Sequence, residues 1–537
     1  MTMKKTIKNI FLFTGIIFGS LTLSHAAIIP PGTKLAINQD IVLHNGSEPA
    51  SLDVHKVESD VEFDIIHDFF SGLIDTGIDG KLNPDLAVSW ETKDNKVWLF
   101  HLREGIKWSD GSPITAHDVV FSWRRLIDPQ MASPYGSYIE NMYITNAKDI
   151  LAGKKKVDAL GVKALDDMTV EVTLEQPLSY FLQMVAHPVM VPISQKAVEK
   201  YGEKWTQPNV FVSSGPFKLA EWIVNEKVIG IRNPQYWDNA HTVINKVTYL
   251  AVTSETAVVN RYLAGEIDIT KSIPSISFNS LKTKLGSQVH ISPKLGVYYY
   301  EFNTQKAPFN DIRVRQALNL ALDKTIISDK VLGQGQKAAY NNTPPNTGGM
   351  NLKQPDYASW TLAKRIEKAR KLLNEAGYNR NNPLKFNLLY NTSEGHTRIA
   401  IAVSSMWKKN LGVDAILQNQ EWKTMLDTMH QSNFDVVRYA WTADYDHPAS
   451  FLNNFVTNSS NNTSLYSNNI YDDLMKKAKT TNDMKYFQQA QDILTRDVPS
   501  IPIYYYVSAR LVKPYIGGYY ISPLGFISLK DLYIIEH

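Results

Sequence analysis

The residues best suited to chemistry in this chain stand together near residue 440. Residues 438–445 read Arg-Tyr-Ala-Trp-Thr-Ala-Asp-Tyr, which places a guanidinium, an indole, a carboxylate and a phenol in one short segment. Charged groups of these kinds hold ammonium and carboxylate partners by strong hydrogen bonds, and aromatic faces hold apolar groups. The segment is therefore suited to hold a zwitterion with an apolar body, such as a peptide, unless it is only the polar end of a strand.

Motifs of catalytic chemistry are missing from the sequence. It holds no G-x-S-x-G turn, no H-E-x-x-H pair and no phosphate-binding loop, and because it has no cysteine it has no thiol nucleophile. His67, beside Asp68, and His430, in an apolar stretch, are expected to be structural groups rather than metal ligands. Residues 213–216, Ser-Ser-Gly-Pro, are expected to lead into a strand rather than to hold a nucleophile. We therefore expect no catalysis, no cofactor and no metal.

The elements that must position segment 438–445 alternate between strands and helices. Residues that alternate between apolar and polar predict strands, and apolar residues at every third or fourth position predict helices. A strand that ends near Tyr439 is expected to present the segment at its carboxyl end. Strands are predicted at 34–43, 97–103, 169–174, 384–389, 434–439 and 501–506, and helices at 61–73, 116–126, 362–376, 400–411 and after the capping residue Asp311.

The length of the chain implies more than one lobe. Its 537 residues exceed the roughly 250–300 at which a single hydrophobic core stops growing, so two or three lobes are expected. Strands and helices alternate over hundreds of residues without a sequence repeat, which predicts a mixed fold of the α/β or α+β class. Aromatic residues make up 11% of the chain, and some of its 11 Trp and 27 Tyr could line a large pocket.

The N-terminus predicts export. Three lysines at positions 4, 5 and 8 precede an apolar run at 10–23, and Ser24-His25-Ala26 suits cleavage before Ala27. The apolar run is shorter than the roughly 20 residues that a membrane anchor needs. The chain has no cysteine to carry a lipid, so we do not expect a lipoprotein. We expect a protein that is free in the periplasm of a Gram-negative cell.

The balance of charge argues against some classes of partner. Three of the 56 basic residues and no acidic residue precede residue 27, which leaves 53 residues of each sign after cleavage. A formal net charge of zero does not suit a protein that binds nucleic acid or an anionic membrane.

Several stretches resemble one known family. Residues 102–123, which read Leu-Arg-Glu-Gly-Ile-Lys-Trp-Ser-Asp-Gly-Ser-Pro-Ile-Thr-Ala-His-Asp-Val-Val-Phe-Ser-Trp, are similar to the signature region of the periplasmic oligopeptide-binding proteins of ABC transporters, solute-binding family 5. The resemblance covers essentially the whole chain after the signal, and it lies close to the subgroup that binds oligopeptides or murein peptides. Further matching stretches are 51–56, 232–238, 306–311, 419–424 and 510–514.

The resemblance implies a three-lobed periplasmic binding protein that closes around its ligand by a hinge motion. Extended peptides would lie between lobes I and III, held by main-chain hydrogen bonds, with hydrated pockets for varied side chains. The closed monomer would then dock on an inner-membrane ABC permease complex. The expected boundaries are 1–26 for the signal peptide, 27–70, 195–296 and 506–537 for lobe I, 71–194 for lobe II, and 297–505 for lobe III.

The resemblance also assigns roles to residues of the chain. Asp444 matches the carboxylate that pairs with the α-ammonium of the ligand. Arg438 matches a cation that meets either a ligand carboxylate or Glu58, itself at the rim of the site, and the sequence leaves both alternatives open. Trp441 and Trp422 match pocket walls, unless they are plain core. The further positions that the resemblance places along the pocket are Tyr135, Tyr504, His396, which would lie near the carboxyl end of a ligand, and Lys271.

Four departures from the family pattern concern the ligand and a disulfide. Lys271 stands where typical members have a tyrosine, Met429 where they often have an arginine, and Leu332 where a lysine lies near the ligand's carboxyl end. Gly296 and Thr442 stand at the two positions of the family's disulfide. These changes affect the preferred length and charge of the peptide and leave the anchor for its ammonium in place.

Four functions remain open at this stage. The first is a receptor for short peptides, and the second is a receptor for the murein tripeptide, which Lys271 and Leu332 favour and Met429 disfavours. The third is an exported peptidase on the same scaffold, and the fourth is a chaperone-like protein. Short peptides and a permease are therefore the expected partners.

Overall fold

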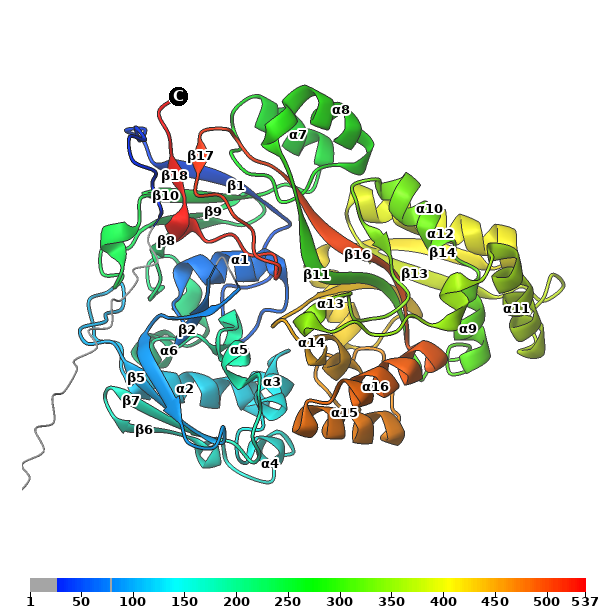
Figure 1. Ribbon diagram of the computed structural model, residues 1–537, viewed down its shortest axis with the longest axis horizontal. Helices are drawn as coiled ribbons and strands as arrows, with labels where there is room; N and C mark the ends of the chain where they lie inside the picture. Colours follow the sequence, from blue (N-terminus) through cyan, green and yellow to red (C-terminus); the bar gives the residue numbers. More distant parts are fainter. Residues whose placement is uncertain (1–26, 78–79) are drawn as a thin grey trace, which may run out of the picture.

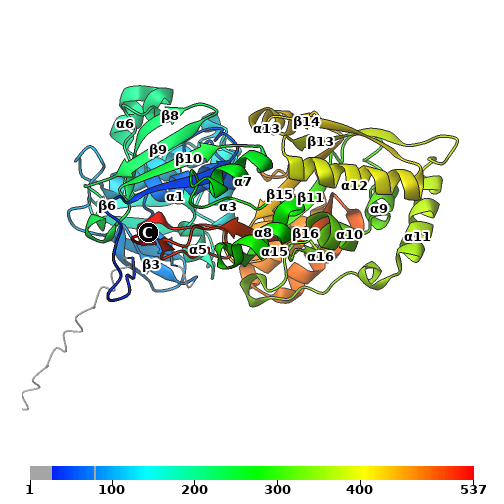
Figure 2. The same ribbon diagram turned by 90° about the horizontal axis from the view of Figure 1, so that it is seen from above.

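The computed structural model describes residues 27–77 and 80–537 of the chain. The predicted signal peptide, residues 1–26, lies outside the described residues. Figures 1 and 2 show two halves side by side, one built on strands β1 to β10 and the other on strands β11 to β16. A search of the described helices finds none that is both long enough and apolar enough to cross a membrane.

A four-stranded sheet, named the N-terminal sheet, joins segments that are far apart in the sequence. Its order is β1-β10-β9-β8, with β1 parallel to β10 and the other neighbours antiparallel. The C-terminal hairpin lies against the start of the chain, where the Gln39 side chain donates to the carbonyl of Ile534 at 2.9 Å. The strands are β1 (Asp40–Gly46), β8 (Phe217–Ile223), β9 (Lys227–Arg232), β10 (Lys246–Ala251), β17 (Ile516–Gly517) and β18 (Tyr533–Ile534).

Helix α1 (Asp60–Phe69) packs on this sheet and begins at the candidate site. The Ser59 side chain caps the helix by accepting a hydrogen bond from the backbone N–H of Val61. At the other end, Phe69 is fully buried against Gly230 of β9, where an added Cβ would lie 2.6 Å from the Phe69 ring. Because Gly230 has no side chain, α1 can pack closely against the sheet at this point.

A second four-stranded sheet, named the small sheet, has the antiparallel order β4-β5-β7-β6. The stretch 102–123 runs from the end of β5 into helix α2 (Ala116–Ile127), where Thr115 and Asp118 form a capping box and Trp123 is fully buried. The neighbouring elements are β2 (Ile74–Thr76), β3 (Leu82–Pro84), β4 (Ala87–Thr92), β5 (Val97–Leu102), β6 (Val162–Asp166), β7 (Thr169–Thr173), α3 (Gly136–Asn141), α4 (Ala147–Leu151), α5 (Phe181–Val185) and α6 (Gln195–Tyr201).

The other half is built on a six-stranded sheet, named the large sheet, with the order β12-β16-β11-β15-β13-β14. Strand β11 is antiparallel to β15 and β16, whereas β13 is parallel to β14 and β15. The strands are β11 (Val289–Phe302), β12 (Lys337–Ala338), β13 (Lys385–Asn391), β14 (Asp414–Gln420), β15 (Val436–Thr442) and β16 (Ser500–Leu511).

Helices surround the large sheet, and two further helices lie near its junction with the other half (Figure 1). The two at the junction are α7 (Glu255–Leu263) and α8 (Phe278–Leu285). The others are α9 (Ile312–Leu320), α10 (Lys324–Ile326), α11 (Leu362–Glu375), α12 (Glu394–Leu411), α13 (Trp422–His430), α14 (Ala449–Leu452), α15 (Asn469–Thr481) and α16 (Met484–Asp497). The mixed α/β class that the sequence predicts is therefore confirmed.

Strands β11 and β16 connect the two halves. They are 14 and 12 residues long and pair with each other, with an irregular register between Pro293 and Val297. The predicted lobe boundaries after residues 296 and 505 fall inside these two strands, which Figure 1 shows running from one half into the other. The lobe boundaries themselves stay a prediction.

The second half of strand β11, residues 296–302, is buried on both faces. Val297 and Tyr299 belong to a hydrophobic cluster that extends through the N-terminal sheet and the small sheet. Tyr298 and Tyr300 belong to a second cluster under the helices of the large sheet. Because successive side chains of a strand point to opposite faces, one strand supports both cores. The candidate site lies above this doubly supported strand and its neighbour β15.

Most predicted elements are confirmed with small shifts of their ends, and four of them need correction. The first strand begins at Asp40 rather than at residue 34, because the residues before it pair with the C-terminal strand at Ile534 and Ile535. Helix α12 begins at Glu394, six residues before the predicted start, because Ser393 caps a polar first turn that lacks the apolar pattern. The predicted helix 61–73 ends at Phe69.

The fourth correction concerns the strand that carries the candidate site. Strand β15 extends to Thr442 instead of ending at Tyr439, so Arg438 and Trp441 lie within the strand. Asp444 lies two residues beyond its end. The polar segment is thus the last part of a strand and the turn after it. The hydrogen bonds of the sheet therefore hold the backbone of residues 438–442 in place.

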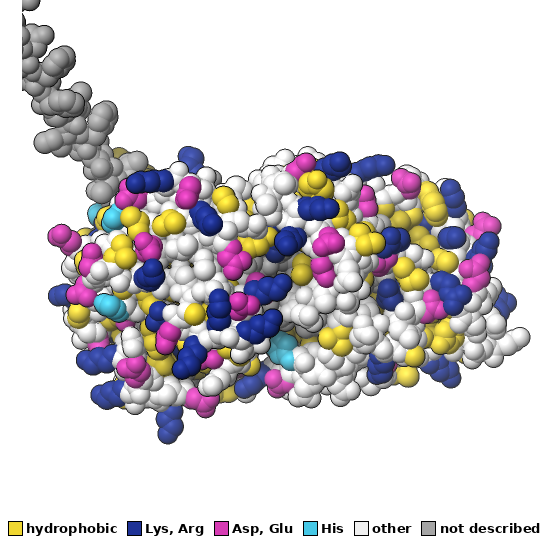
Figure 3. Space-filling view, turned by 90° about the horizontal axis from the view of Figure 1, so that it is seen from below, with side chains coloured by type: hydrophobic (Ala, Val, Ile, Leu, Met, Phe, Trp, Pro, Cys, Tyr) yellow, Lys and Arg dark blue, Asp and Glu magenta, His cyan; other side chains and the backbone are white. Residues whose placement is uncertain are grey.

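The surface agrees with the balanced charge of the sequence. On the face drawn in Figure 3, basic and acidic side chains are interspersed over both halves of the molecule. A surface of mixed sign fits a protein that carries no net attraction for a polyanion.

The contact between α1 and the N-terminal sheet can be tested at Gly230. Gly230→Ala places a methyl group 2.6 Å from the Phe69 ring and 2.9 Å from Val247, so we expect a loss of about 1–3 kcal/mol in the free energy of unfolding. Urea denaturation followed by tryptophan fluorescence measures this loss.

Gly136→Ala is the matched control for Gly230→Ala. Its new methyl group meets only the end of Leu151, at an ordinary contact distance of 3.4 Å, within helix α3. We expect no loss of stability from this change. Equal stability of the two variants would contradict the packing that we describe for α1.

Candidate functional site

Two cavities with shared walls lie between the halves of the molecule. The smaller, of about 140 Å³, is named the Asp444 cavity, and the larger, of about 240 Å³, is named the Lys271 cavity. Residues that line both are Ser59, Asp60, Trp422, Arg438 and Tyr506. The Asp444 cavity is further lined by Glu58, Tyr135, His187, Lys294 and Trp441, and the Lys271 cavity by His44, Glu255, Asn391 and His396.

The structure brings eight of the nine predicted site residues to these walls, and it places Tyr504 elsewhere. Tyr504 is buried beneath the large sheet, where its ring stacks on Tyr298 with centroids 4.8 Å apart. It lines neither cavity and supports the residues that do. That the other eight bind a ligand stays a prediction.

Asp444 is enclosed by neutral donors. Its side chain is 8% exposed, and its Oδ1 accepts a hydrogen bond from the Tyr135 hydroxyl at 2.9 Å, with the His187 Nε2 at 3.3 Å. The hydroxyl of Ser450 lies 3.3 Å from Oδ2. Among the residues that the structure describes, no Lys or Arg forms an ion pair with this carboxylate.

The donors around Asp444 are fixed by their own partners. The His187 Nδ1 accepts the backbone N–H of Val189 at 3.1 Å, so the neutral ring carries its hydrogen on Nε2 and directs it at Asp444. Burial and the nearby carboxylate raise the pKa of Tyr135 well above its usual value, which keeps its hydroxyl a donor. A buried carboxylate that lacks a full cationic partner is costly, so the site favours a positively charged guest beside it.

Arg438 presents the opposite case, a buried cation with neutral partners. It is 6% exposed, donates to the side chain of Asn391 at 3.1 Å and to the Tyr506 hydroxyl at 2.8 Å, and lies over the ring of Tyr298 at 4.6 Å. Its Nε has no hydrogen-bond partner among the described residues. The guanidinium therefore retains capacity for an anion.

The alternative partner for Arg438, Glu58, is engaged elsewhere. One oxygen of Glu58 lies 3.1 Å from Nε2 of His430, at the end of α13. Glu58 therefore pairs with His430 rather than with Arg438, so one of the two alternatives left open for Arg438 is not realised in the structure. His430 is a structural group, as expected, and its side chain lies at the surface although its neighbours in the sequence are apolar. The apolar residues near His430 in the sequence point to the other face of the helix.

The two tryptophans form walls of the Asp444 cavity. Trp441 lies over the ring of Tyr135, and Trp422 stacks on Tyr439 with planes 7° apart. The indole N–H groups of both are buried and have no acceptor among the described residues. Each wall therefore offers an apolar face together with an unused donor.

His396 lines the Lys271 cavity as an uncharged ring. Burial, with the charges of Arg438 and Arg398, lowers the pKa of His396 well below its usual 6.5. Its Nδ1 has no partner among the described residues. Neutral His396 can form a hydrogen bond with a guest, whereas the positive charge on this wall comes from Arg438 and Lys271.

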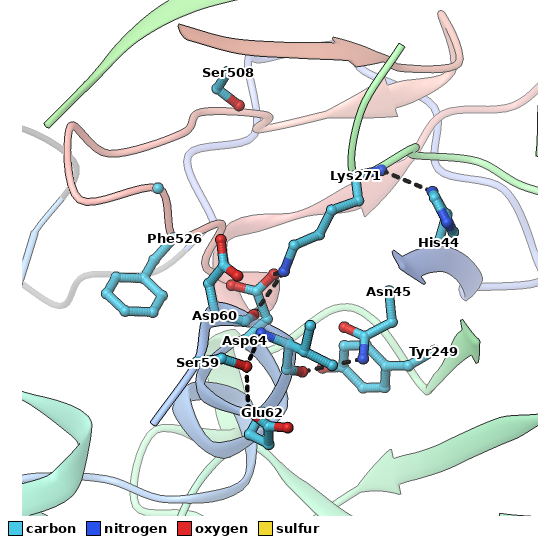
Figure 4. Close-up of polar contacts among 12 residues, drawn as sticks. His44, Asn45, Ser59, Asp60, Glu62, Asp64, Tyr249, Lys271, Ser508 and Phe526 are labelled. Atoms are coloured by element: carbon cyan, nitrogen blue, oxygen red, sulfur yellow. Dashed lines mark hydrogen bonds and ion pairs between the residues drawn. The ribbon is translucent and has the colours of Figure 1, made fainter. Parts of the chain in front are cut away.

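Two lysines and two aspartates form a network beside the cavities, and Figure 4 shows its part around Lys271, Asp60 and Asp64. Lys271 Nζ donates to Asp64 Oδ2 at 2.6 Å and to the carbonyl of Asp60 at 2.6 Å, and Lys294 Nζ donates to Asp60 Oδ2 at 2.9 Å. Burial opposes ionisation of Asp60, yet the charges of Lys271 and Lys294 hold its pKa far below its usual value. Asp60 and Asp64 are four residues apart and share one face of α1.

The other departures from the family pattern bring no cation to the cavities. Met429 is buried in α13 and Leu332 packs on the core of the large sheet, and neither lines a cavity. Gly296 and Thr442, the two disulfide positions of the resemblance, face each other in register on β11 and β15. Their place in the sheet is kept without a covalent bond.

Several residues of the walls could not be picked out from the sequence. Among them, His187 stands 257 positions before Asp444, and no local pattern connects the two. The acids at 60 and 64 show only the spacing of one helix face. In the described part of the chain, no group of three or more His, Asp or Glu side chains is arranged to hold a metal ion.

Comparison with known proteins places this geometry among binding proteins. The model of a family described as bacterial extracellular solute-binding proteins, family 5 Middle, matches residues 81–463. The chain is 51% identical over 540 residues to the periplasmic oligopeptide-binding protein OppA of Salmonella typhimurium, covering 99% of each chain. Each finding covers more than half of the chain.

Solved structures distinguish two arrangements of the halves. A crystal structure of Haemophilus influenzae OppA in complex with the peptide RPPGFSPFR is 45% identical and superposes with a TM-score of 0.91, covering 94% of this chain and 100% of the other. A murein tripeptide binding protein in its unliganded open form is 42% identical with a TM-score of 0.66, covering 95% and 99%. The halves of the present structure are therefore arranged more like those of the peptide complex.

The pair of His430 and Glu58 predicts a pH dependence. The hydrogen bond that His430 donates to Glu58 raises the pKa of His430 above its usual 6.5, so the pair stabilises the fold below about pH 6.5 and loses this effect as the pH rises through the raised pKa. The stability difference between wild type and His430→Gln should therefore be larger at about pH 6 than at about pH 9 in urea denaturation.

Glu58→Gln is the companion change in this test. It should remove the same part of the pH dependence, because it removes the carboxylate that raises the pKa. A stability difference for His430→Gln that stays constant over this range would contradict the pairing.

Proposed function

Because the chain belongs to family 5 of the bacterial extracellular solute-binding proteins, we propose that it is the peptide-binding component of an ABC transporter. In this proposal it binds short peptides in extended form in the periplasm and delivers them to an inner-membrane permease complex. It is no enzyme and needs no cofactor. The single observation that carries the proposal is Asp444, a buried carboxylate with no Lys or Arg beside it in the described chain.

The ammonium group of a peptide supplies the missing partner. It would lie beside Asp444, where the Tyr135 hydroxyl and the His187 N–H already hold the carboxylate in position. Charge-assisted hydrogen bonds of this kind are among the strongest that proteins form. The Arg438 guanidinium would meet a carboxylate of the same ligand, so a zwitterion satisfies both buried charges.

The backbone of β15 offers an edge for an extended ligand. Strand β13 pairs with β15 at Val436 and Val437, and no further register partner on that side is found among the described residues. The following residues, Ala440 to Thr442, line the Asp444 cavity. A peptide could therefore add as a strand here, with affinity from main-chain bonds and little demand on its side chains.

Closure of the two halves would complete the site. Two of the donors to Asp444, Tyr135 and His187, come from the half that carries the small sheet, whereas Asp444 itself follows strand β15 of the large sheet. Contacts between the halves include the backbone N–H of Ser460, which donates to the Ser137 hydroxyl at 2.8 Å. We propose that the lobes predicted from the sequence move about β11 and β16 to form these contacts around a ligand.

Export completes the proposal. The signal predicted at residues 1–26 is expected to be cleaved before Ala27, and the absence of cysteine in the sequence leaves no residue for a lipid anchor. The protein would then act as a free monomer in the periplasm, where its relative OppA is described as periplasmic.

Removing the charge of Asp444 tests the proposal. Asp444→Asn should weaken binding of a tripeptide by about 3–5 kcal/mol, roughly a hundredfold or more in Kd, because a buried ammonium loses its partner. Titration calorimetry with the tripeptide and with its N-acetylated form measures the effect. Acetylation should weaken binding to the wild type and should cause little further loss in the variant.

Asp427→Asn is the control for this change. Asp427 is an exposed carboxylate on α13 that lines neither cavity, so its loss should leave the tripeptide Kd within about twofold. Unchanged affinity of Asp444→Asn, or equal affinity of the wild type for free and acetylated peptide, would contradict the proposal.

The natural ligand separates the two binding functions that remain. Relatives include a protein described as murein tripeptide binding, and Lys271 and Leu332 favour that ligand whereas Met429 does not. Mass spectrometry of ligand released by denaturing protein from its own periplasm should show mixed short peptides for a general receptor, and one species for a murein receptor. Incubation with a peptide mixture should leave the peptides intact, and shortened peptides would show a peptidase instead.

A further inference from the structure

Lys271 lines the Lys271 cavity, and its hydrogen-bond partners satisfy its ammonium group only in part. Its ammonium has three N–H donors, and the structure uses two of them, on Asp64 and on the backbone carbonyl of Asp60. The Lys271 side chain lines the cavity, whereas Asp64 does not. Lys271 therefore belongs to the wall that a guest in this cavity would contact, and its counterion Asp64 does not.

The position of Lys271 is fixed on both sides. Its backbone N–H donates to the Nδ1 of His44 at 3.3 Å, and the His44 Nε2 lies 2.8 Å from the carbonyl of Val252. Burial lowers the pKa of His44 to about 4, so the ring is neutral and adds no competing charge. Figure 4 shows the Lys271 side chain reaching from this anchor across to α1.

The other charges on the cavity wall leave an excess of positive charge. The two acids that line it are each paired with a cation, Asp60 with Lys294 at 2.9 Å and Glu255 with Arg398 at 2.8 Å. Arg438 lines the same wall without an acidic partner. With Lys271 and Asp64 included, the group carries four cations and three acids, so its formal charge is +1.

We propose that Lys271 is a specificity-determining residue that binds a carboxylate carried by the ligand beyond its first residue. The inference rests on the proposed function, in which Asp444 holds the amino end in the neighbouring cavity. The carboxylate has two possible sources, an acidic side chain at the second or third position or the carboxyl terminus. A third hydrogen bond from the Lys271 ammonium recognises either one.

The test compares each acidic peptide with its uncharged isostere. Titration calorimetry gives Kd for tri-alanine derivatives with Glu or Gln at the first, second or third position, and for peptides with a free or an amidated carboxyl end. The readout for each pair of peptides is the affinity for the acidic peptide divided by the affinity for its amide counterpart. A variant that weakens the binding of both peptides equally leaves this ratio unchanged. The glutamate series reports on side chains and the amidated series on the terminus.

We expect Lys271→Met to lower the ratio about tenfold for at least one pair beyond the first residue, with the Glu/Gln ratio at the first residue unchanged. Lys271→Arg keeps the charge and should keep most of the preference. Asp64→Asn removes the competing carboxylate and should raise the same ratio that Lys271→Met lowers.

Lys246→Met is the matched control. Lys246 also pairs with an aspartate of the N-terminal half, Asp40, at 2.7 Å, and it lines neither cavity. It should leave every ratio unchanged. Ratios that stay within twofold of wild type in Lys271→Met, or that fail to rise in Asp64→Asn, would overturn the inference, whereas wild-type protein that binds none of the peptides would overturn the proposed function itself.

Discussion

A charge that is removed from water needs an opposite charge, and this site contains two buried charges to which the described chain supplies no opposite partner. Asp444 is held by two hydroxyls and an imidazole, and Arg438 by an amide, a hydroxyl and an aromatic ring. The groups keep both charges oriented without neutralising them. A zwitterionic guest is the simplest way to complete such a site, and an extended peptide is a zwitterion that also fits a strand edge.

The rest of the structure serves to bring these groups together. Strand β15 carries Arg438 and the turn after it carries Asp444, in a sheet whose central strand β11 is buried on both faces beside them, so their positions follow from two hydrophobic cores. Two of the donors to Asp444, Tyr135 and His187, belong to the other half, which reaches it only when the halves meet as they do here. Ligand binding and closure therefore depend on the same contacts. This coupling is what a transporter needs in order to distinguish a loaded receptor from an empty one.

The sequence predicted the chemistry of segment 438–445 because that chemistry lies within one strand and the turn after it. It could not predict His187, since the contact with Asp444 joins residues 257 positions apart. It left the partner of Arg438 open, and the structure excludes Glu58 because His430 turns toward it from the exposed face of α13. The family resemblance placed Tyr504 at the pocket, whereas the structure buries it beneath the large sheet, because a pattern of strand residues does not tell which buried face meets a cavity. The ends of helices and strands differ from the predicted ones where a capping residue or pairing with a distant segment sets the end, because the spacing of apolar residues does not show either.

A crystal structure of the protein with a bound tripeptide tests the central claim most directly. The account predicts that the peptide's α-ammonium nitrogen lies within hydrogen-bond distance of the Asp444 carboxylate, with Tyr135 and His187 still bound to it. The peptide would run along β15 toward Arg438. A peptide that lies in the reverse direction, with its carboxyl group beside Asp444, or one that leaves Asp444 without a cation, would contradict the account.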